Sequence, residues 1–301
     1  MSRQLQMLRE KIESARTLLE VVETMRGLAM VNIRRAEAVA AQAAQYARTV
    51  HLALNAALRR MDSRSLRRLL RQDERAARTR PTTVLLISTD MGLCGQFNER
   101  VVEYALAFWR RETAAAGADP FRWIVVGLRG WERLRDTKAR LTARLDAPGS
   151  VEAVGTAAVE AFVALSHVLD EKGRLIVIHN APSDDTLFAP RHLQLAPFEA
   201  WRWLAWPADE PPWKTPPLID PAPEKVLPYL VREQVYIDLF HAFIQSFAAE
   251  NAARLASMRN ASDNIEELLE ELQMRYRRER QDVITNELME LLGGVEAVLD
   301  K

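Results

Sequence analysis

Apolar residues near the start of the chain recur with alternating spacings of three and four. They form a narrow helical stripe with an average repeat near 3.5 residues, the repeat of a coiled-coil seam. The stripe consists of Leu5, Leu8, Ile12, Ala15, Leu19, Val22, Met25, Ala29, Ile33, Ala36, Ala40, Ala43 and Ala47. The spacing returns near the other end, at Ile265, Leu269, Leu272, Tyr276, Ile284, Leu288, Leu291, Val295 and Val298. The pattern predicts two long helices, within residues 1–75 and 229–301, that pair as an antiparallel coiled coil.

The middle of the chain has a different texture. Apolar runs at 83–88, 122–127 and 174–179 read as strands, and they are separated by helical patterns at 98–112, 130–136 and 151–170. Strands that alternate with helices predict right-handed crossovers and a small, largely parallel sheet. We therefore expect a Rossmann-like α/β domain over residues 76–200, inserted between the two coiled-coil helices. Residues 201–228 hold most of the 14 prolines and four of the seven tryptophans, which predicts an irregular connection.

Composition excludes several classes of protein. The 301 residues include 41 basic and 41 acidic side chains, so no net charge draws the whole molecule to nucleic acid or an anionic membrane. A single cysteine cannot form an internal disulfide. No apolar run approaches the 18 or more residues that a bilayer span needs, so any membrane role would be peripheral.

The stretch TVLLISTDMGLCGQFNERVV, at 83–102, places Cys94 on a strand-to-helix turn, where α/β enzymes expose nucleophiles. One hypothesis is a cysteine-dependent α/β hydrolase in which His179, which follows the third strand, activates Cys94. No cysteine-hydrolase signature surrounds Cys94, and the favoured interpretation is a small buried side chain that closes a structural turn with Gly92 and Gly95. The turn lacks the glycines and Lys-Ser/Thr of phosphate loops, so no cofactor is expected. The five histidines have no metal-ligand spacing, so no metal is expected either.

Two basic stretches raise a second alternative. Residues 58–80 carry nine arginines against three acidic residues, which is compatible with an Arg-rich coiled-coil nucleic-acid binder, but they contain no aromatic side chain to stack on bases. The run RYRRERQ, at 275–281, interrupts the apolar seam, so something other than the partner helix should face it. Beyond it, LMELLGGVEAVLD at 288–300 is strongly apolar for a chain end and predicts an external apolar sleeve.

Longer motifs resemble the gamma subunits of F-type ATP synthases over nearly the whole chain. The most specific are STDMGLCGQFN at 88–98, REQVYIDLFHAFIQSFAAENAARLASMRNASDN at 232–264 and RERQDVITNELMELLGG at 278–294. A looser match is ETMRGLAMVNIRRAE at 23–37. The resemblance implies a non-catalytic central stalk that couples ATP synthesis or hydrolysis to proton or sodium transport.

The resemblance also implies the partners and the location. The two terminal helices would form a shaft inside a ring of alpha and beta subunits, and the α/β domain would stand on the c-subunit ring beside epsilon. Such a subunit binds no nucleic acid and no cofactor. It lies at the cytoplasmic face of the bacterial inner membrane as a peripheral protein, and touches the membrane only through its partners.

Site residues follow from the resemblance by position. Arg280 and Gln281 match contacts to a beta-subunit loop, and further rotor-stator positions are Arg254, Thr285 and Glu287. Weaker N-terminal contacts would be Met25, Arg34 and Arg35. The chain departs from the family at Met91, where arginine is usual, at Gln96, where glycine is usual, and at Glu20 and Glu23, where lysine is usual. These departures favour a divergent bacterial branch, such as the alternative N-type ATPases.

Overall fold

The computed structural model describes residues 3–67, 81–116, 121–170, 173–198, 218–220 and 222–299. The chain forms two units, one of residues 1–29 with 255–301 and the other of residues 30–254. Helices α1 (Arg3–Arg60) and α7 (Pro223–Leu299) each contribute to both units. Most of the predicted irregular connection, and residues 68–80 of the arginine-rich stretch, lie outside the described residues.

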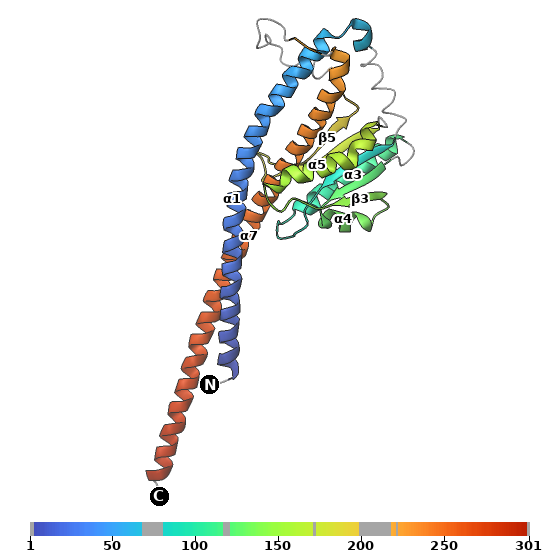
Figure 1. The fold of residues 1–301 in the computed structure, drawn as a ribbon. Helices are drawn as coiled ribbons and strands as arrows, with labels where there is room; N and C mark the ends of the chain where they lie inside the picture. Colours follow the sequence, from blue (N-terminus) through green and yellow to red (C-terminus); the bar gives the residue numbers. More distant parts are fainter. Residues whose placement is uncertain are drawn as a thin grey trace. The chain divides into compact units, whose positions relative to one another are not determined.

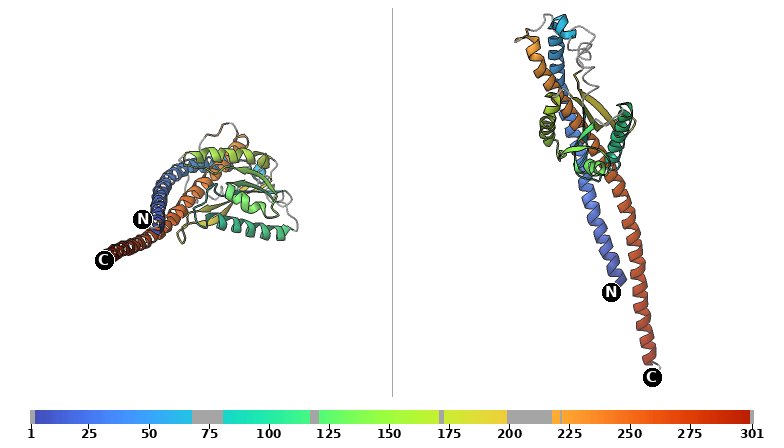
Figure 2. Two further views of the ribbon diagram at one scale, coloured as in Figure 1. Left: turned by 90° about the horizontal axis from the view of Figure 1, so that it is seen from below. Right: turned by 90° about the vertical axis from the view of Figure 1, so that its right-hand side faces the viewer.

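The first unit is the predicted two-helix seam. Ile12 and Ala15 of α1 pack on Leu269 and Leu272 of α7. The partly buried side chains around this contact are Leu8, Leu19, Ile265 and Tyr276. In this unit the two helices lie side by side and run in opposite directions, with both chain ends at the same end of the unit (Figures 1 and 2). The antiparallel coiled coil predicted from the spacing of the apolar residues is therefore confirmed.

The second unit contains a five-stranded sheet in the order β3-β2-β1-β4-β5. The strands are β1 (Thr82–Ile87), β2 (Phe121–Val126), β3 (Leu141–Leu145), β4 (Arg174–Ala181) and β5 (Ala189–Ala196). The pairs β1–β2, β1–β4 and β2–β3 are parallel, whereas β5 is antiparallel to β4. The three predicted strands are thus the central ones, and the two edge strands are additions.

Helices cover both faces of this sheet. The helices between strands are α3 (Phe97–Ala116), α4 (Leu128–Arg135) and α5 (Ala153–Asp170). On one face, β-strand residues such as Leu85 and Val126 pack against α5 and against the α7 segment around Phe243. On the other face, Leu86 and Trp123 pack against α3 and α4. Because both faces are covered, the central strands read as continuous apolar runs, which is why the sequence predicted them.

Candidate functional site

The end of β1 caps the short helix α4. The N-cap residue of α4 is Gly127, which has no side chain to accept hydrogen bonds from the free N–H groups of the first turn. Three consecutive residues after β1 provide the acceptors instead. The Leu128 N–H donates to Asp90 Oδ1 at 2.8 Å, the Arg129 N–H donates to the Thr89 carbonyl at 2.9 Å, and the Gly130 N–H donates to Ser88 Oγ at 3.0 Å. This helix N-terminus, which in nucleotide-binding folds is free to take a phosphate, is occupied by the protein itself.

The cap needs two glycines, one at the N-cap and one in the first turn of α4, because the strand end and the helix start approach closely. A Cβ added at Gly127 would lie 2.7 Å from backbone atoms of Ser88 and Thr89, and Gly127 has a φ of 91°. A Cβ added at Gly130 would overlap the Ser88 hydroxyl. The strand end and the helix start therefore fit only with glycine at these positions.

Asp90 connects three parts of the domain. While Oδ1 caps α4, its other oxygen, Oδ2, accepts the Ala147 N–H, in the loop after β3, at 2.8 Å. Both carboxylate oxygens are thus used by backbone donors from separate elements. This arrangement holds the carboxyl end of the sheet together, and it directs neither oxygen to a substrate.

Cys94 is a buried structural residue. Its side chain is 1% exposed and packs with Phe97 and Phe188 against α7 at Ala249 and Ala253. Asn98 Nδ2 lies 3.5 Å from the sulfur and also donates to Thr89 Oγ1 at 2.9 Å. Burial, reinforced by the Glu250 charge, raises the pKa of the Cys94 thiol, so the nucleophilic thiolate is disfavoured.

The structure does not bring Cys94 and His179 together as a dyad. His179 Nε2 lies 3.1 Å from Gln245 Oε1, and burial lowers the pKa of this histidine. Asp184 and Asp185, which follow β4, are exposed. No hydrogen bond between described side chains joins the thiol to the imidazole, so the described geometry does not support the hydrolase interpretation. Within the same described residues, no group of His, Cys, Asp and Glu side chains could hold a metal ion.

The turn of residues 88–98 has the tight backbone that its glycines predicted. Leu93 has a φ of 62° and Gly95 a φ of 55°, both in the left-handed region. Gly92 has room for a side chain, with the Arg129 guanidinium 3.7 Å from the position of a Cβ. Gly95 is therefore the glycine of the predicted structural turn whose backbone conformation calls for that residue type.

Arg254 lies against this turn and is largely buried. Its Nη2 is 2.6 Å from Glu250 Oε1, and the two side chains are 17% and 13% exposed. Burial raises the pKa of Glu250, the Arg254 charge opposes that rise, and the charge of Asp90 adds to it. Next to Glu250, Asn251 accepts a hydrogen bond of 3.2 Å from Asn32 of α1. The charge of Arg254 is thus paired within the protein.

The last part of α7 has the opposite character. Arg280, Gln281, Thr285 and Glu287 are all exposed. Within the described part of the chain, no hydrogen bond or ion pair engages their side chains. Their helical spacing places Arg280, Ile284 and Glu287 along one face, with Gln281 and Thr285 one step around the helix. Polar side chains of this kind are available to a partner.

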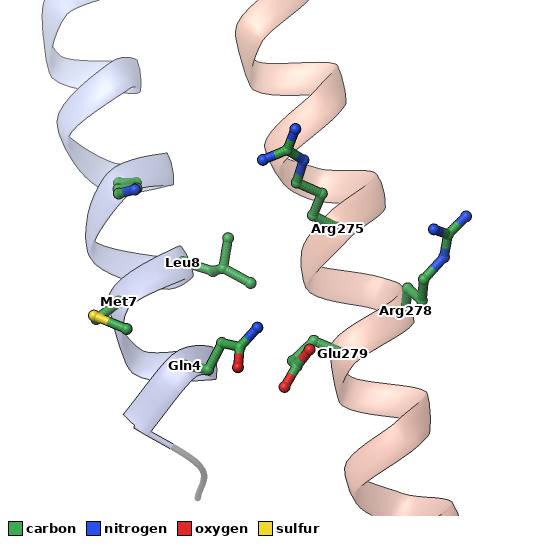
Figure 3. Close-up of a pocket in the computed structure, with 7 residues that line it drawn as sticks. Gln4, Met7, Leu8, Arg275, Arg278 and Glu279 are labelled. Carbon is green, nitrogen blue, oxygen red and sulfur yellow. The ribbon is translucent and has the colours of Figure 1, made fainter.

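A groove with a volume of about 360 Å³ lies beside this face, between the two helices of the first unit. It is lined by Gln4, Met7, Leu8, Lys11, Arg275, Arg278 and Glu279. In Figure 3, Gln4 and Glu279 point toward each other across the gap, and Leu8 is directed from α1 toward α7. Arg275 is paired with Glu271 on its own helix. The sequence did not predict the groove, although it forms just where the apolar seam gives way to polar residues.

The candidate N-terminal contacts lie in three different environments. Met25 is partly buried and Arg34 is exposed. Arg35 forms an exposed ion pair of 3.4 Å with Glu152, which lies just before α5. Among the two reversed charges, Glu23 lies 3.9 Å from Arg26 on the surface of α1. No described helix is long and apolar enough to cross a membrane.

Comparisons with known proteins agree along the full length of the chain. The family model described as ATP synthase matches residues 4–298. The ATP synthase gamma chain of Chlorobium phaeobacteroides is 28% identical over 97% of both chains, and that of Geotalea daltonii is 26% identical over 98% of both. The fold matches a rotor chain of the Euglena gracilis mitochondrial ATP synthase with a TM-score of 0.60 at 16% identity, covering 93% of this chain and 99% of that chain.

A second structure supports the same fold. It describes the OSCP/F1/c-ring part of the Euglena gracilis enzyme and matches with a TM-score of 0.62 at 16% identity, covering 98% of this chain and 94% of that one. The family match favours the rotor interpretation over the hydrolase and the nucleic-acid binder. With its only cysteine buried and a family match from residue 4 to residue 298, the chain belongs to the ATP synthase gamma family, the non-catalytic rotor of the central stalk.

Proposed function

We propose that the chain is the shaft that links a c-subunit ring to the catalytic beta subunits of an ATP synthase at the cytoplasmic face of the bacterial inner membrane. The first unit turns within a ring of alpha and beta subunits, and the α/β domain carries the contacts to epsilon and the c-ring. Support comes from the family match and from the similar Euglena gracilis structure, which contains F1 and the c-ring together. The four departures from the family pattern support a divergent branch.

The observation that carries the residue-level proposal is the exposed pair Arg280 and Gln281, whose side chains have no partner among the described residues. A guanidinium donates planar, charge-assisted hydrogen bonds to a carboxylate, and a glutamine amide beside it donates a neutral one. Together they suit a contact with an acidic beta-subunit loop that forms at one rotary position and breaks at the next. Thr285 and Glu287, on the same part of the helix, are further candidate rotor-stator positions.

The groove next to this pair gives the stator loop a second point of contact. Its rim carries the exposed cations Lys11 and Arg278, while the Arg275 charge is already engaged by Glu271. Beyond the groove, Ile284, Leu288 and Met289 are 47%, 55% and 66% exposed, past the region where α7 packs on α1. Exposed apolar side chains in a row favour an apolar bearing in the surrounding ring.

Arg254 has a different task in this proposal. It pairs with the largely buried Glu250 on the same helix, in the α7 segment whose Ala249 and Ala253 pack on Cys94, so it acts as a residue that neutralises a buried charge at this contact. Replacement by alanine would leave the Glu250 carboxylate buried without its counter-ion, at a cost of about 3 kcal/mol. Its effect on coupling would therefore come through stability.

The proposal is tested in membranes that carry Arg280→Ala together with Gln281→Ala. Removing both contacts should cost roughly 2 to 4 kcal/mol of rotor-stator interaction if they are buried against beta. We expect the number of ions pumped per ATP hydrolysed to fall.

A matched control is Arg259→Ala with Asn260→Ala, which removes an exposed charge and an adjacent exposed amide from the same helix. The control should keep wild-type coupling. Wild-type ATP hydrolysis and pumping in the Arg280 and Gln281 double variant would show that these residues are not the contact, while family membership would stand.

A further inference from the structure

A group of polar residues interrupts the apolar packing between α1 and α7 within the unit of residues 30–254. The surrounding apolar cluster consists of Ala47, Val50, Leu54, Leu58, Leu227 and Ile237. His51 and Asn55 come from α1, and Gln234, Asp238 and His241 come from α7. Asn55 and Gln234 are 4% and 2% exposed, and both histidines are half-buried. We call these five residues the histidine seam.

Each imidazole interacts with a group of the opposite helix: His51 of α1 with the Gln234 side chain, and His241 of α7 with the backbone of Ala43. Gln234 Nε2 donates to Asp238 Oδ1 at 3.0 Å, and the buried Gln234 Oε1 has no hydrogen-bond partner among the described residues. Among the described residues, the buried His241 Nε2 has no hydrogen-bond partner. A proton added there would place an unmatched N–H donor and a positive charge inside the seam.

The neutral imidazoles suit this environment better than imidazolium ions do. Burial lowers the pKa of both histidines, and the proximity of His241 lowers that of His51 further. The hydrogen bonds to Gln234 and Ala43 oppose this without overcoming it. Two carboxylates of the same α7 segment are engaged by neighbours: Asp238 accepts a hydrogen bond from Gln234, and Glu233 accepts one of 2.6 Å from Tyr46.

The sign of the pH dependence follows directly. A histidine with a lowered pKa in the folded state contributes its full stabilisation above its ordinary value of about 6.5 and loses it as the pH falls through the folded value. Glu250 acts in the opposite direction, since burial raises the pKa of its carboxyl. Glu250 belongs to the contact at Cys94, so its effect can be separated from that of the histidines by position along α7.

We propose that the histidine seam is an acid-sensitive contact, which holds α1 and α7 together at neutral pH and opens as the pH falls. At neutral pH the two uncharged imidazoles pack between the helices and the seam is closed. When the surrounding pH falls, two neighbouring positive charges form in the seam, and the helices separate locally around His51 and His241. The separation follows from the seam alone, whereas its consequence for torque rests on the proposed shaft function.

Hydrogen exchange on the full chain at pH 7.5 and pH 5.5, corrected for intrinsic exchange rates, tests this opening. A histidine of ordinary pKa, about 6.5, in the open state gains a factor of about ten from protonation between pH 7.5 and pH 5.5, so protection of residues 47–58 and 230–241 should fall by up to about tenfold for each histidine. In His51→Gln with His241→Asn, which carries no titrating group at either position, the fall should shrink to about twofold or less.

The matched control is His192→Gln, which removes the histidine of β5 that lies 2.6 Å from the Tyr104 hydroxyl, and which should keep the wild-type pH response. An undiminished response in the double variant, or no response in the wild type, overturns the proposal. If the double variant does not fold, NMR titration of the wild-type histidines decides. Either ring titrating at or above its ordinary pKa overturns the proposal too.

The assembled complex tests the consequence. Ions pumped per ATP hydrolysed should fall with pH in the wild type and much less in the double variant, whereas an equal fall in both overturns a role for the seam in torque. Failure of the proposed shaft contact can be distinguished from failure of the seam proposal. In the first case, the Arg280→Ala with Gln281→Ala variant pumps as many ions per ATP hydrolysed as the wild type at pH 7.5.

Discussion

The turn at residues 88–98 and the exposed face of α7 at residues 280–287 both carry motifs of the gamma family, but they use polar side chains in opposite ways. In the turn, Ser88, Asp90 and Asn98 find their hydrogen-bond partners inside the domain. On α7, Arg280 and Gln281 project outward, and no partner for them lies within the described residues. The difference indicates that the motif at residues 88–98 stabilises the fold, whereas the motif at residues 280–287 is suited to bind another subunit. Substitutions in the first should act on stability, and substitutions in the second only in the complex.

The largest effect is expected from Gly127→Ala. The new methyl group would meet backbone atoms of Ser88 and Thr89 at 2.7 Å, at a residue whose φ of 91° is already unfavourable for alanine. Strain and overpacking together should remove about 3 kcal/mol or more of the free energy of unfolding. Chemical denaturation of the isolated chain measures this.

Gly155→Ala is the control for that substitution. No atom lies within 4 Å of a Cβ added at Gly155, which is in helix α5. Alanine should stabilise the chain there by about 0.5 to 1 kcal/mol because it favours the helix. Equal losses at the two glycines would refute the steric account of the α4 cap.

The next effect in size is Asp90→Ala, which removes the acceptors of both Leu128 N–H and Ala147 N–H. Two unsatisfied backbone donors should cost about 2 to 3 kcal/mol of unfolding free energy. Asp146→Ala, next to Ala147 in sequence, removes a carboxylate whose side chain is 82% exposed. That control should change stability by less than about 0.5 kcal/mol. Similar values for the two variants would show that Asp90 does not tie these elements together.

Cys94→Ser should cost about 1 kcal/mol of stability, because a hydroxyl replaces a sulfur in a partly apolar site. Assembly of the complex and its ATPase activity should stay near normal. Thermal denaturation and a hydrolysis assay measure the two effects. If the complex with Cys94→Ser assembled but did not hydrolyse ATP, the Cys94 thiol would have a chemical role after all.

The smallest change in the stability of the isolated chain is expected from the double variant at Arg280 and Gln281, although the same variant should have a large effect on coupling in the complex. Arg280→Ala with Gln281→Ala should change the unfolding free energy by less than about 0.5 kcal/mol, since neither side chain has a partner in the described structure. A loss of more than about 1 kcal/mol would show that these residues serve the fold, and the contrast between the two motifs would fail.

The sequence predicted the elements that leave a regular apolar pattern, either because one helical stripe is buried or because a strand is buried on both faces. The coiled-coil stripe places Ile12 and Leu269 in contact, as expected, and the central strands β1, β2 and β4 were recognised from continuous apolar runs. The edge strands were missed. Strand β3 is only partly buried, and β5 contains Pro190 and His192, which interrupt an apolar run and are tolerated at a sheet edge.

The polar parts of the candidate sites were harder to predict than the fold. The glycines beside Cys94 suggested a structural turn, and the buried thiol agrees with that interpretation. The burial of Arg254 was not predictable, since a Glu250–Arg254 spacing of four residues is equally common on exposed helices. The groove beside Leu8 and the histidine seam arise from side chains that are remote in sequence, so no local pattern could reveal them.

The two-helix seam also has a kinetic consequence for biosynthesis. The partner of Ile12 is Leu269, so the apolar stripe of α1 emerges from the ribosome long before the helix that covers it. Domains fold as units during synthesis, and the α/β domain can complete its sheet while α1 still lacks its partner. During that interval the exposed stripe is a target for chaperones and for wrong pairing with another nascent copy. Closure of the largest loop in the chain is thus left until the end of translation, and that step should set the yield of assembled rotor.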